Sequence, residues 1–386
     1  MNLLFDPWLP TSSGKLSLLE ALERVRDVQI TLSGTPFISV LRLQLAACLY
    51  GGESSVSLLR SGISSRTLRK LERHRGAFEL RDGYLTCPDL EALVHPHAII
   101  CGEWPTGNTM AFHHHTRDDR PIQLEDNALA LRLLEFQAFA PTAGQSPTGY
   151  RRLSPCADVV LAVAIGENLL ETLALNLVPD ERPAMPSWAL ARAQSEDFLL
   201  QSRNSAGSVS EQYTWLAQAV RLHENGVGTA RGFGLENRID PMMTVWTRKR
   251  DGEQRPLKPA GIEPWLLACR AMGLGTDGTP TLRHAAALGV PHQVRVVAQV
   301  SSPKNKVKVL ERIDETYTLE QLSLSLSDAV WRHRQRLAKT SNDLARTFVS
   351  TVEDRLIKEG NAFRFEEFWR DFKTSIPIPS RSLRRN

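Results

Sequence analysis

The feature that most constrains the fold is an alternation of residue types between Val300 and Arg312, which reads VSSPKNKVKVLER. Lys304, Lys306 and Lys308 recur at a spacing of two, with neutral or apolar residues between them. Because side chains of an extended chain alternate between two faces, this spacing puts three ammonium groups on one face. Residues 292–300 are rich in β-branched residues, and a Ser-Ser-Pro turn follows them. We therefore predict a β-hairpin whose second strand begins with a basic face near the tip.

Two interpretations of this basic face stay open. Lysines on a solvated edge strand protect a sheet against edge-to-edge aggregation, and the same lysines would suit a ribbon that enters a nucleic-acid groove. The charge distribution favours contact with a polyanion, because residues 301–386 hold 17 Lys and Arg against 12 Asp and Glu, whereas the first 300 residues hold 30 against 31. The surplus is too small for an indiscriminate DNA-binding protein.

The chain shows no sign of a disulfide framework, a zinc knuckle or a membrane anchor. Its five cysteines are scattered and form no CxxC pair. No apolar run comes near the length of about 18 residues that a membrane helix requires, and the first residues lack a basic start and a small-residue cleavage site. We expect a cytoplasmic protein without cofactors or membrane contact.

The periodicity of the chain predicts an α+β fold, a mixed α/β body with β-hairpins followed by a small helical bundle. The length of 386 residues allows two or three domains, and we expect the body to span residues 1–316 and the bundle, with its basic tail, residues 317–386. Helices are expected over residues 16–25, 37–49, 64–73, 124–138, 169–177 and 262–272, with three more after residue 316, and residues 188–222 show a helical pattern with a loop near residues 204–208. Strands are expected over residues 2–5, 28–32, 157–165 and 242–247, and a second hairpin over residues 78–86.

The run His113-His114-His115, close to Asp118 and Asp119, raises the possibility of a metal site. Consecutive histidines point to different sides of the chain, and metal ligands usually come from separated positions, so contacts to phosphates or bases are the favoured role. The chain has no nucleophile elbow, no distinctive carboxylate pair and no GxGxxG motif after a strand. The sequence therefore predicts a protein that is not an enzyme.

Positive charge recurs where loops and turns are expected, and loops on a rigid body commonly carry binding groups. These positions are Arg117, Arg120, Arg151, Arg152, residues 248–250 and residues 304–308. A further basic cluster lies at one end of the helix expected over residues 64–73. Its members Arg66, Arg69, Lys70, Arg73 and Arg75 form either a phosphate-facing patch or a solvated helix end.

An ordered series of segments runs from the first residue to about Arg312. In order, they are NLLFDPWLP, WPTGNTMAFHHHT, LRLLEFQAF with a glycine-containing loop after it, GENLLETLALNLVP, YTW with VRL, DPM and NKVKVLER. In this order and spacing, they resemble the CasA family, the large subunit of the type I-E CRISPR Cascade complex.

The resemblance implies a non-catalytic subunit that recognises the protospacer-adjacent motif in double-stranded DNA from the minor groove. It would then begin strand separation, so that the guide crRNA can pair with the target strand and an R-loop can form. The implied partners are double-stranded target DNA, the 5′ handle of the crRNA, other Cascade subunits and a recruited helicase-nuclease.

Four segments of this sequence match the family's functional elements. The glycine loop corresponds to residues 140–144, with Gly144, and the lysine hairpin to Arg248, Lys249 or Arg250. The wedge that splits the first base pairs corresponds to Asn305 and Lys306, with Lys304 and Lys308 flanking it on the phosphates. The loop that contacts the crRNA handle and neighbouring subunits corresponds to residues 112–120 and contains Phe112, His113, His114, Arg117 and Arg120.

The sequence departs from the family pattern in three places. Lys306 stands where family members commonly have a glutamine in the wedge, which would favour phosphate attraction over amide contacts. The cysteine-rich zinc insertion of some relatives is absent between Leu222 and Pro241. The family ends in a four-helix bundle, whereas about three helices fit after residue 316, so a short variant is expected in which another subunit supplies the missing part.

Two alternatives remain. The chain could be a structural subunit that caps the 5′ handle of the crRNA with little reading of the motif, or a metal-dependent nuclease centred on residues 113–115.

Overall fold

The computed structural model describes residues 1–101, 123–141, 154–190, 206–233, 239–248, 252–274, 278–301 and 309–325. The α-helices are α1 (Leu18–Glu23), α2 (Gly34–Gly51), α3 (Ser55–Ser61), α4 (Ser65–Glu72), α5 (Asp126–Phe139), α6 (Leu169–Asn176), α8 (Val209–Tyr213), α9 (Pro264–Ala271) and α10 (Pro280–Leu288). Short 3-10 helices are η1 (Arg75–Phe78), η2 (His97–Ile100) and η3 (Ser187–Ala189). The strands are β1 (Leu9–Thr11), β2 (Gly14–Leu16), β3 (Val94–His95), β4 (Val160–Ile165), β5 (Gln218–His223), β6 (Gly226–Arg231), β7 (Trp246–Arg248), β8 (Gln254–Pro256), β9 (Gln293–Ser301) and β10 (Val309–Tyr317). This mixture confirms the predicted α+β class.

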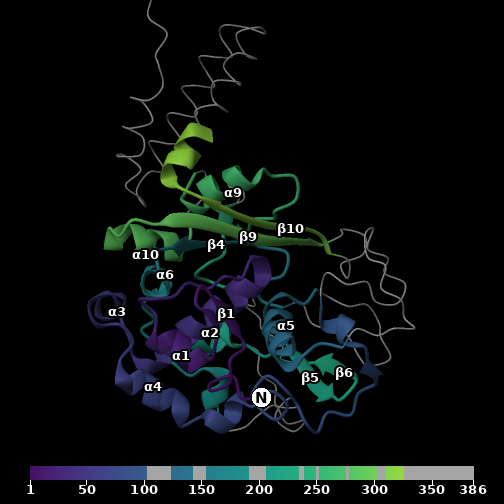
Figure 1. Ribbon diagram of the computed structural model, residues 1–386. Coiled ribbons are helices and arrows are strands. Elements are labelled where there is room, and N and C mark those ends of the chain that lie inside the picture. The colour runs from purple at the N-terminus through teal and green to yellow at the C-terminus, as the bar shows by residue number, and fades with distance from the viewer. Residues whose placement is uncertain are drawn as a thin grey trace, which may run out of the picture.

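An antiparallel sheet of order β10-β9-β4 divides the body into two cores (Figure 1). Alternate residues of β4 and β9 face opposite sides, as the two-residue period of a strand requires. Leu161 and Val163 of β4 join a large core that includes α1, α2, α5 and α8. Val160 of β4 and Val296 of β9 join a second core with α9 and α10. The sheet is therefore buried on both faces, which explains the nearly unbroken apolar run of β4.

Helix α2 forms the centre of the larger core and is buried along almost its whole length. It ends at Gly52, whose φ of 86° lies in the left-handed region that favours glycine. At 18 residues, it is about 27 Å long. Its first turn lies beside the β9–β10 hairpin, and its last turn packs on α4, where a Cβ on Gly51 would overlap the side chain of Thr67.

The predicted hairpin around residues 292–312 is confirmed as β9 and β10, which pair from Val294 with Tyr317 to Ser301 with Val309. Four other predictions were wrong. The strands expected over residues 2–5 and 28–32 are absent, and these ranges contribute only the isolated bridges of Asn2 with Glu79 and of Ile30 with Thr11. Residues 78–86 form turns, because the chain folds back so tightly that a Cβ on Gly83 would lie 2.1 Å from the Glu79 carbonyl oxygen. Within the described part of residues 188–222, α8 is short and β5 replaces the rest of the expected helix.

The glycine-rich run that begins at Gly226 forms strand β6 between β5 and β3. A Cβ on Gly226 would lie 2.4 Å from the carbonyl oxygen of His95, so glycine permits this close approach of β3 to β6.

Residues 319–325 are helical, and residues 326–386, which include most of the expected bundle, lie outside the described part of the chain. The proposed boundary near residue 316 stays a prediction. In the described residues, no helix is long and apolar enough to span a membrane.

Candidate nucleic-acid interface

Almost all of the predicted site residues lie outside the described residues. These are Phe112, His113, His114, Arg117 and Arg120 of the handle loop, Gly144 of the glycine loop, Lys249 and Arg250, and Lys304, Asn305, Lys306 and Lys308 of the hairpin tip. Arg248 is described and is exposed at the end of β7. The structure does describe the elements from which each of these segments leaves the body, and their arrangement can be compared directly.

The stem of the β9–β10 hairpin is fixed to the first turn of α2. The Asp314 carboxylate accepts from Arg295 Nε at 2.7 Å and from the Gly34 amide at 2.7 Å. Ser33, the N-cap of α2, makes no side-chain cap bond, so Asp314 supplies an acceptor and a negative charge to this helix end. The Arg295 guanidinium also stacks 4.2 Å from the centre of the Phe37 ring. These contacts hold the orientation of the hairpin relative to the body.

A second anchor joins the hairpin to α5 through Glu135, which is 3% exposed. Its carboxylate contacts Arg312 of β10 at 2.8 Å, Arg132 at 2.6 Å and the Thr35 hydroxyl at 2.5 Å. A β-bulge follows between Val309 and Glu311, at the end of β10 near the tip. Bulges bend a strand and re-aim its end, and they are common next to functional sites.

The glycine-loop segment, residues 142–153, leaves from the end of α5 and returns to the same place. The Ser154 amide donates to the Ala140 carbonyl at 3.0 Å, and the Cys156 amide donates to the Ala138 carbonyl at 2.8 Å. In addition, Gln299 near the end of β9 donates its side-chain amide to the Phe139 carbonyl at 3.1 Å. The neck of this loop is therefore joined directly to the strand that leads to the hairpin tip.

Strands β7 and β8 pair as an antiparallel hairpin, with Arg248 opposite Gln254, and the assignment of its turn as the lysine hairpin stays a prediction. The segment before β7 lies along β4 on the side away from β9: Thr244 forms an antiparallel bridge with Leu161, and the Val245 amide donates to the Val160 carbonyl at 2.9 Å. Since both β9 and this segment run antiparallel to β4, both continue in the same direction past the start of β4.

These registers bring the three predicted DNA-facing segments to one end of the sheet. Val160, the first residue of β4, lies between Ala298 of β9 and Val245. With neighbouring strands about 4.8 Å apart, the strands leading to the hairpin tip and to Arg248 are roughly 10 Å from each other at this level. The sequence had no means of predicting this convergence.

The handle-loop segment, residues 102–122, leaves from the opposite end of α5. The Leu124 amide donates to His97 Nδ1 at 3.0 Å and ties the returning chain to η2. Burial lowers the pKa of the His97 imidazole, and so does the charge of Arg81, which favours the neutral form that can accept this bond. Because α5 has 14 residues, the two loop bases are about 20 Å apart.

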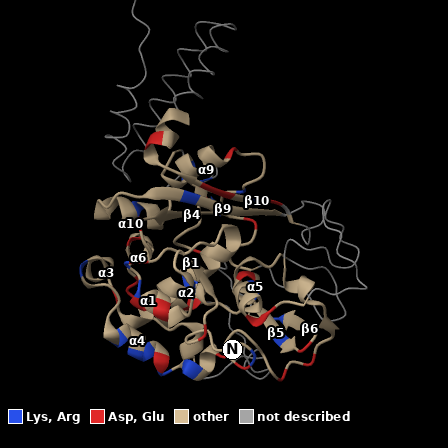
Figure 2. Cartoon of the chain, in the orientation of Figure 1, with Lys and Arg blue, Asp and Glu red and all other residues tan. Residues whose placement is uncertain are grey.

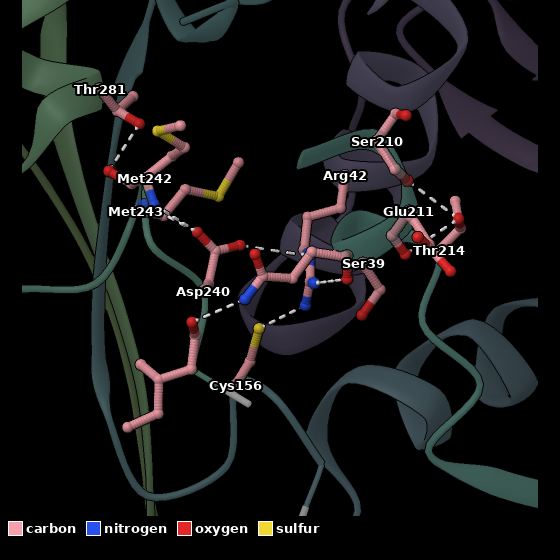
Figure 3. A network of polar contacts seen from close by, with 12 residues as sticks. Ser39, Arg42, Cys156, Ser210, Glu211, Thr214, Asp240, Met242, Met243 and Thr281 are labelled. Carbon is pink, nitrogen blue, oxygen red and sulfur yellow. Dashed lines mark hydrogen bonds and ion pairs between the residues drawn. The ribbon is translucent and has the colours of Figure 1, made fainter. Parts of the chain in front are cut away.

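Behind the convergent end lies a buried polar network around Arg42 of α2 (Figure 3). Its guanidinium donates to Cys156 Sγ at 2.5 Å and to the Gln212 carbonyl at 2.6 Å, and forms an ion pair with Asp240 at 3.4 Å. The Asp240 carboxylate accepts from the amides of Met242 and Met243, each at 2.9 Å. Arg42 thus joins the return of the glycine loop to the segment that leads into β7.

The network is fully buried, with the Arg42 and Asp240 side chains 1% and 0% exposed. Burial lowers the pKa of Arg42, but its interactions with Cys156 and Asp240 raise it, and the net pKa lies above the usual value. Burial raises the pKa of the Cys156 thiol to about 12, so the thiol is neutral at physiological pH. Sequence reasoning missed this network, although an arginine within the apolar run of α2 was a signal for it.

The described residues contain no group of three or more His, Cys, Asp or Glu side chains that could hold a metal ion. The five cysteines all lie in the described ranges, and all are buried and reduced. Residues 113–115, on which the alternative of a metal-dependent nuclease is centred, lie outside these ranges.

The comparisons with known proteins identify the family. A family model described as CRISPR-associated protein Cse1 matches residues 2–371. The chain belongs to the Cse1 family. It is 28% identical over 263 residues to the CasA/Cse1 protein of Thermus thermophilus, an alignment that covers 62% of this chain and 52% of that protein. This Cse1-family chain therefore spans about half the length of the curated relative that it matches.

Solved structures of Cse1 proteins share this fold. The chain superposes on Thermus thermophilus CasA with a TM-score of 0.66 at 24% identity, covering 88% of this chain and 80% of that one. Cse1 from Acidimicrobium ferrooxidans gives a TM-score of 0.65 at 15% identity, covering 98% and 89%. A chain of a CRISPR RNA-guided surveillance complex gives 0.63 at 16% identity, covering 98% and 90%. The resemblance to the CasA family is thereby confirmed for this Cse1-family chain.

Proposed function

We propose that this chain is the non-catalytic large subunit of a crRNA-guided Cascade complex, which reads the protospacer-adjacent motif in duplex DNA and begins strand separation. The observation that supports the proposal is the convergence of three segments at one end of the β4–β9 sheet. The three segments that leave the body there are residues 142–153, the turn of the β7–β8 hairpin and residues 302–308. A duplex held at this end would meet all three at once.

Each segment suits a different step. Glycine in the first lets the backbone approach the groove floor closely. Basic side chains on the β7–β8 hairpin would contact phosphates and the minor-groove edge, whose degenerate pattern allows a loose motif preference. Asn305 and Lys306 would enter the base stack as a wedge, at a cost of a few kcal/mol per unstacked step. Pairing of the guide with the target strand then proceeds as a nearly balanced exchange.

The anchors of the hairpin suit the work of a wedge. A tip that separates bases must transmit force to a rigid body, and the stem is held by the ion pair of Arg295 with Asp314 and by the contact of Arg312 with Glu135. Both contacts are partly shielded from solvent, so salt screens them less than exposed pairs.

The test uses the complex reconstituted with its guide RNA and two duplexes that differ only in the candidate motif. We expect tighter binding to the duplex with the motif, and equal affinity for both would overturn the proposal. Lys306→Ala should reduce strand opening, measured with a fluorescent base analogue, more than it reduces initial binding. Glu320→Ala, an exposed position beyond β10, is the control variant. Equal losses in both assays would contradict a wedge.

A second role, contact with the 5′ handle of the crRNA, is supported by the position of residues 102–122. They leave the body about 20 Å from the glycine-loop base, at the other end of α5. One rigid helix could therefore separate an RNA-binding loop from a DNA-reading loop. Arg117→Ala with Arg120→Ala should weaken assembly on the guide without changing motif preference. If motif preference changes instead, this division of roles is wrong.

A further inference from the structure

Helix α4 carries a concentration of positive charge that none of the elements above accounts for. Residues 60–75 hold six Lys and Arg and one Glu, a surplus of five, which exceeds the net charge of +4 for the whole chain. Figure 2 shows the blue segments of α4 at the end of the molecule away from the β9–β10 hairpin. The near balance of charge over the first 300 residues conceals this local surplus.

Three of these arginines lie on one face of α4. Thr67 and Leu71 form the buried face, whereas Arg66, Arg69 and Arg73 are exposed. Positions i, i+3 and i+7 lie along the same side of a helix, so the three guanidinium groups follow a line about 10 Å long. We call these three residues the α4 arginine face.

The arginine face lacks acidic partners within the described part of the chain. No ion pair joins any of its members to a carboxylate there, and Arg69 donates only to the Ser65 carbonyl of its own helix. The nearby Glu53 carboxylate accepts from the amide and hydroxyl of Ser64. Glu79 accepts from the side-chain amide of Asn2.

Intramolecular stability does not explain the arrangement. Arg66 lies in the first turn of α4, where a positive charge opposes the helix dipole. Like charges three and four residues apart on a helix also repel one another. Lys70 differs, because its ammonium donates to the Tyr50 carbonyl at 2.7 Å and secures the end of α2. The arginine face is therefore an unfavourable arrangement until an external anion is present.

We propose that the α4 arginine face binds the sugar-phosphate backbone of the duplex that flanks the recognised motif. This inference rests on the proposed function for the position of the duplex. Helix α2 places α4 about 27 Å from the base of the β9–β10 hairpin, a distance of roughly eight base pairs at 3.4 Å per pair. A duplex that runs from the hairpin tip along this side of the body reaches α4 on the order of ten base pairs from the motif.

The test compares two variants of the full chain in the reconstituted complex. The first is Arg66→Gln/Arg69→Gln/Arg73→Gln, in which glutamine keeps the helix propensity of α4. The matched control, Lys15→Gln/Arg24→Gln/Arg283→Gln, removes the same charge from three exposed positions outside α4. Each is measured on motif-containing duplexes with a flank of about 25 base pairs and of about 5 base pairs, lengths that lie on either side of the predicted contact.

On the long flank, the arginine variant should lower the slope of log affinity against log salt by up to about 2.7, or about 0.9 per lost phosphate contact. Between 50 and 200 mM salt, the wild type should then lose about 40-fold more affinity than the variant. On the duplex with the short flank, the arginine variant and the wild type should bind with equal affinity and equal salt dependence. The control should behave as the wild type on both.

Three results would overturn the inference: an unchanged slope in the arginine variant, an equal change in the control, or an equal loss on both flank lengths. The last would point to a protein partner. Duplexes without the motif distinguish a failure of this inference from a failure of the proposed function. If the wild type binds duplexes with and without the motif equally, only the proposed function is refuted, and the effect of flank length on the arginine variant can still be measured.

Discussion

The buried pair of Arg42 and Asp240 gives the sharpest test of how the body is held together. Replacing Asp240 by Asn keeps an oxygen for the amides of Met242 and Met243 but leaves the Arg42 guanidinium without a counter-charge, where both side chains are at most 1% exposed. Removing one member of a buried pair costs about 3–5 kcal/mol, and we expect Asp240→Asn near the lower limit because the amide contacts survive.

Replacing Arg42 by Met removes two further donors and leaves the Asp240 charge uncompensated. We expect this change to lie near the upper limit of about 5 kcal/mol. The double variant leaves no isolated charge, so its loss should be smaller than the sum of the single losses by at least about 2 kcal/mol. Urea unfolding followed by circular dichroism measures all three free energies of unfolding.

The two single variants and the double variant form a double-mutant cycle. Its control is the same cycle on the exposed pair of Arg81 and Asp126, whose side chains are 45% and 41% exposed. Because solvent screens exposed pairs, its coupling energy should be at most about 1 kcal/mol. If the losses of unfolding free energy at Arg42 and Asp240 are additive, or no larger than those of the control pair, the two buried charges do not depend on each other and the expected coupling is refuted.

Two further predictions concern the hairpin anchor and the pH dependence of stability. Glu135→Gln should lower the free energy of unfolding by about 1.5–3 kcal/mol, since Arg132 and Arg312 lose a charged acceptor, and Glu311→Gln, at an exposed position, should leave it nearly unchanged in the same urea assay. Burial lowers the pKa of His74, His97, His223 and His284, so their contribution to stability is complete above the ordinary histidine pKa of about 6.5 and is lost as the pH falls below it. Tm should therefore be lower near pH 5.5 than near pH 7.5, and equal values would contradict the sign of these shifts.

Local patterns predicted much of the framework. The alternation of residues 292–312 indicated β9 and β10, and the long apolar run within residues 37–49 indicated α2. Both depend on periodicity within one segment, which the sequence shows directly. The prediction of a hairpin over residues 78–86 was wrong, because the sequence pattern around Gly83 is equally compatible with a hairpin and with the compact turns that close against Glu79.

The convergence at the start of β4 could not be predicted, because it depends on contacts between distant segments. The bond from Gln299 to Phe139 spans 160 residues, and the pair of Arg42 and Asp240 spans almost 200. A single sequence contains no periodicity over such separations. The family resemblance located the candidate segments, but the registers of β4 with β9 and with Thr244 were required to bring them to one end.

The closed neck of residues 142–153 has an evolutionary consequence. The bonds from Ser154 to Ala140 and from Cys156 to Ala138 fix the two ends of this segment whatever lies between them. Doubling the length of a flexible loop costs only about 0.6 kcal/mol in closure entropy. Insertions, deletions and whole exchanges of this segment should thus be tolerated by the fold. Under the proposed function, exchange of this segment alone would change the recognition specificity and leave the scaffold unchanged.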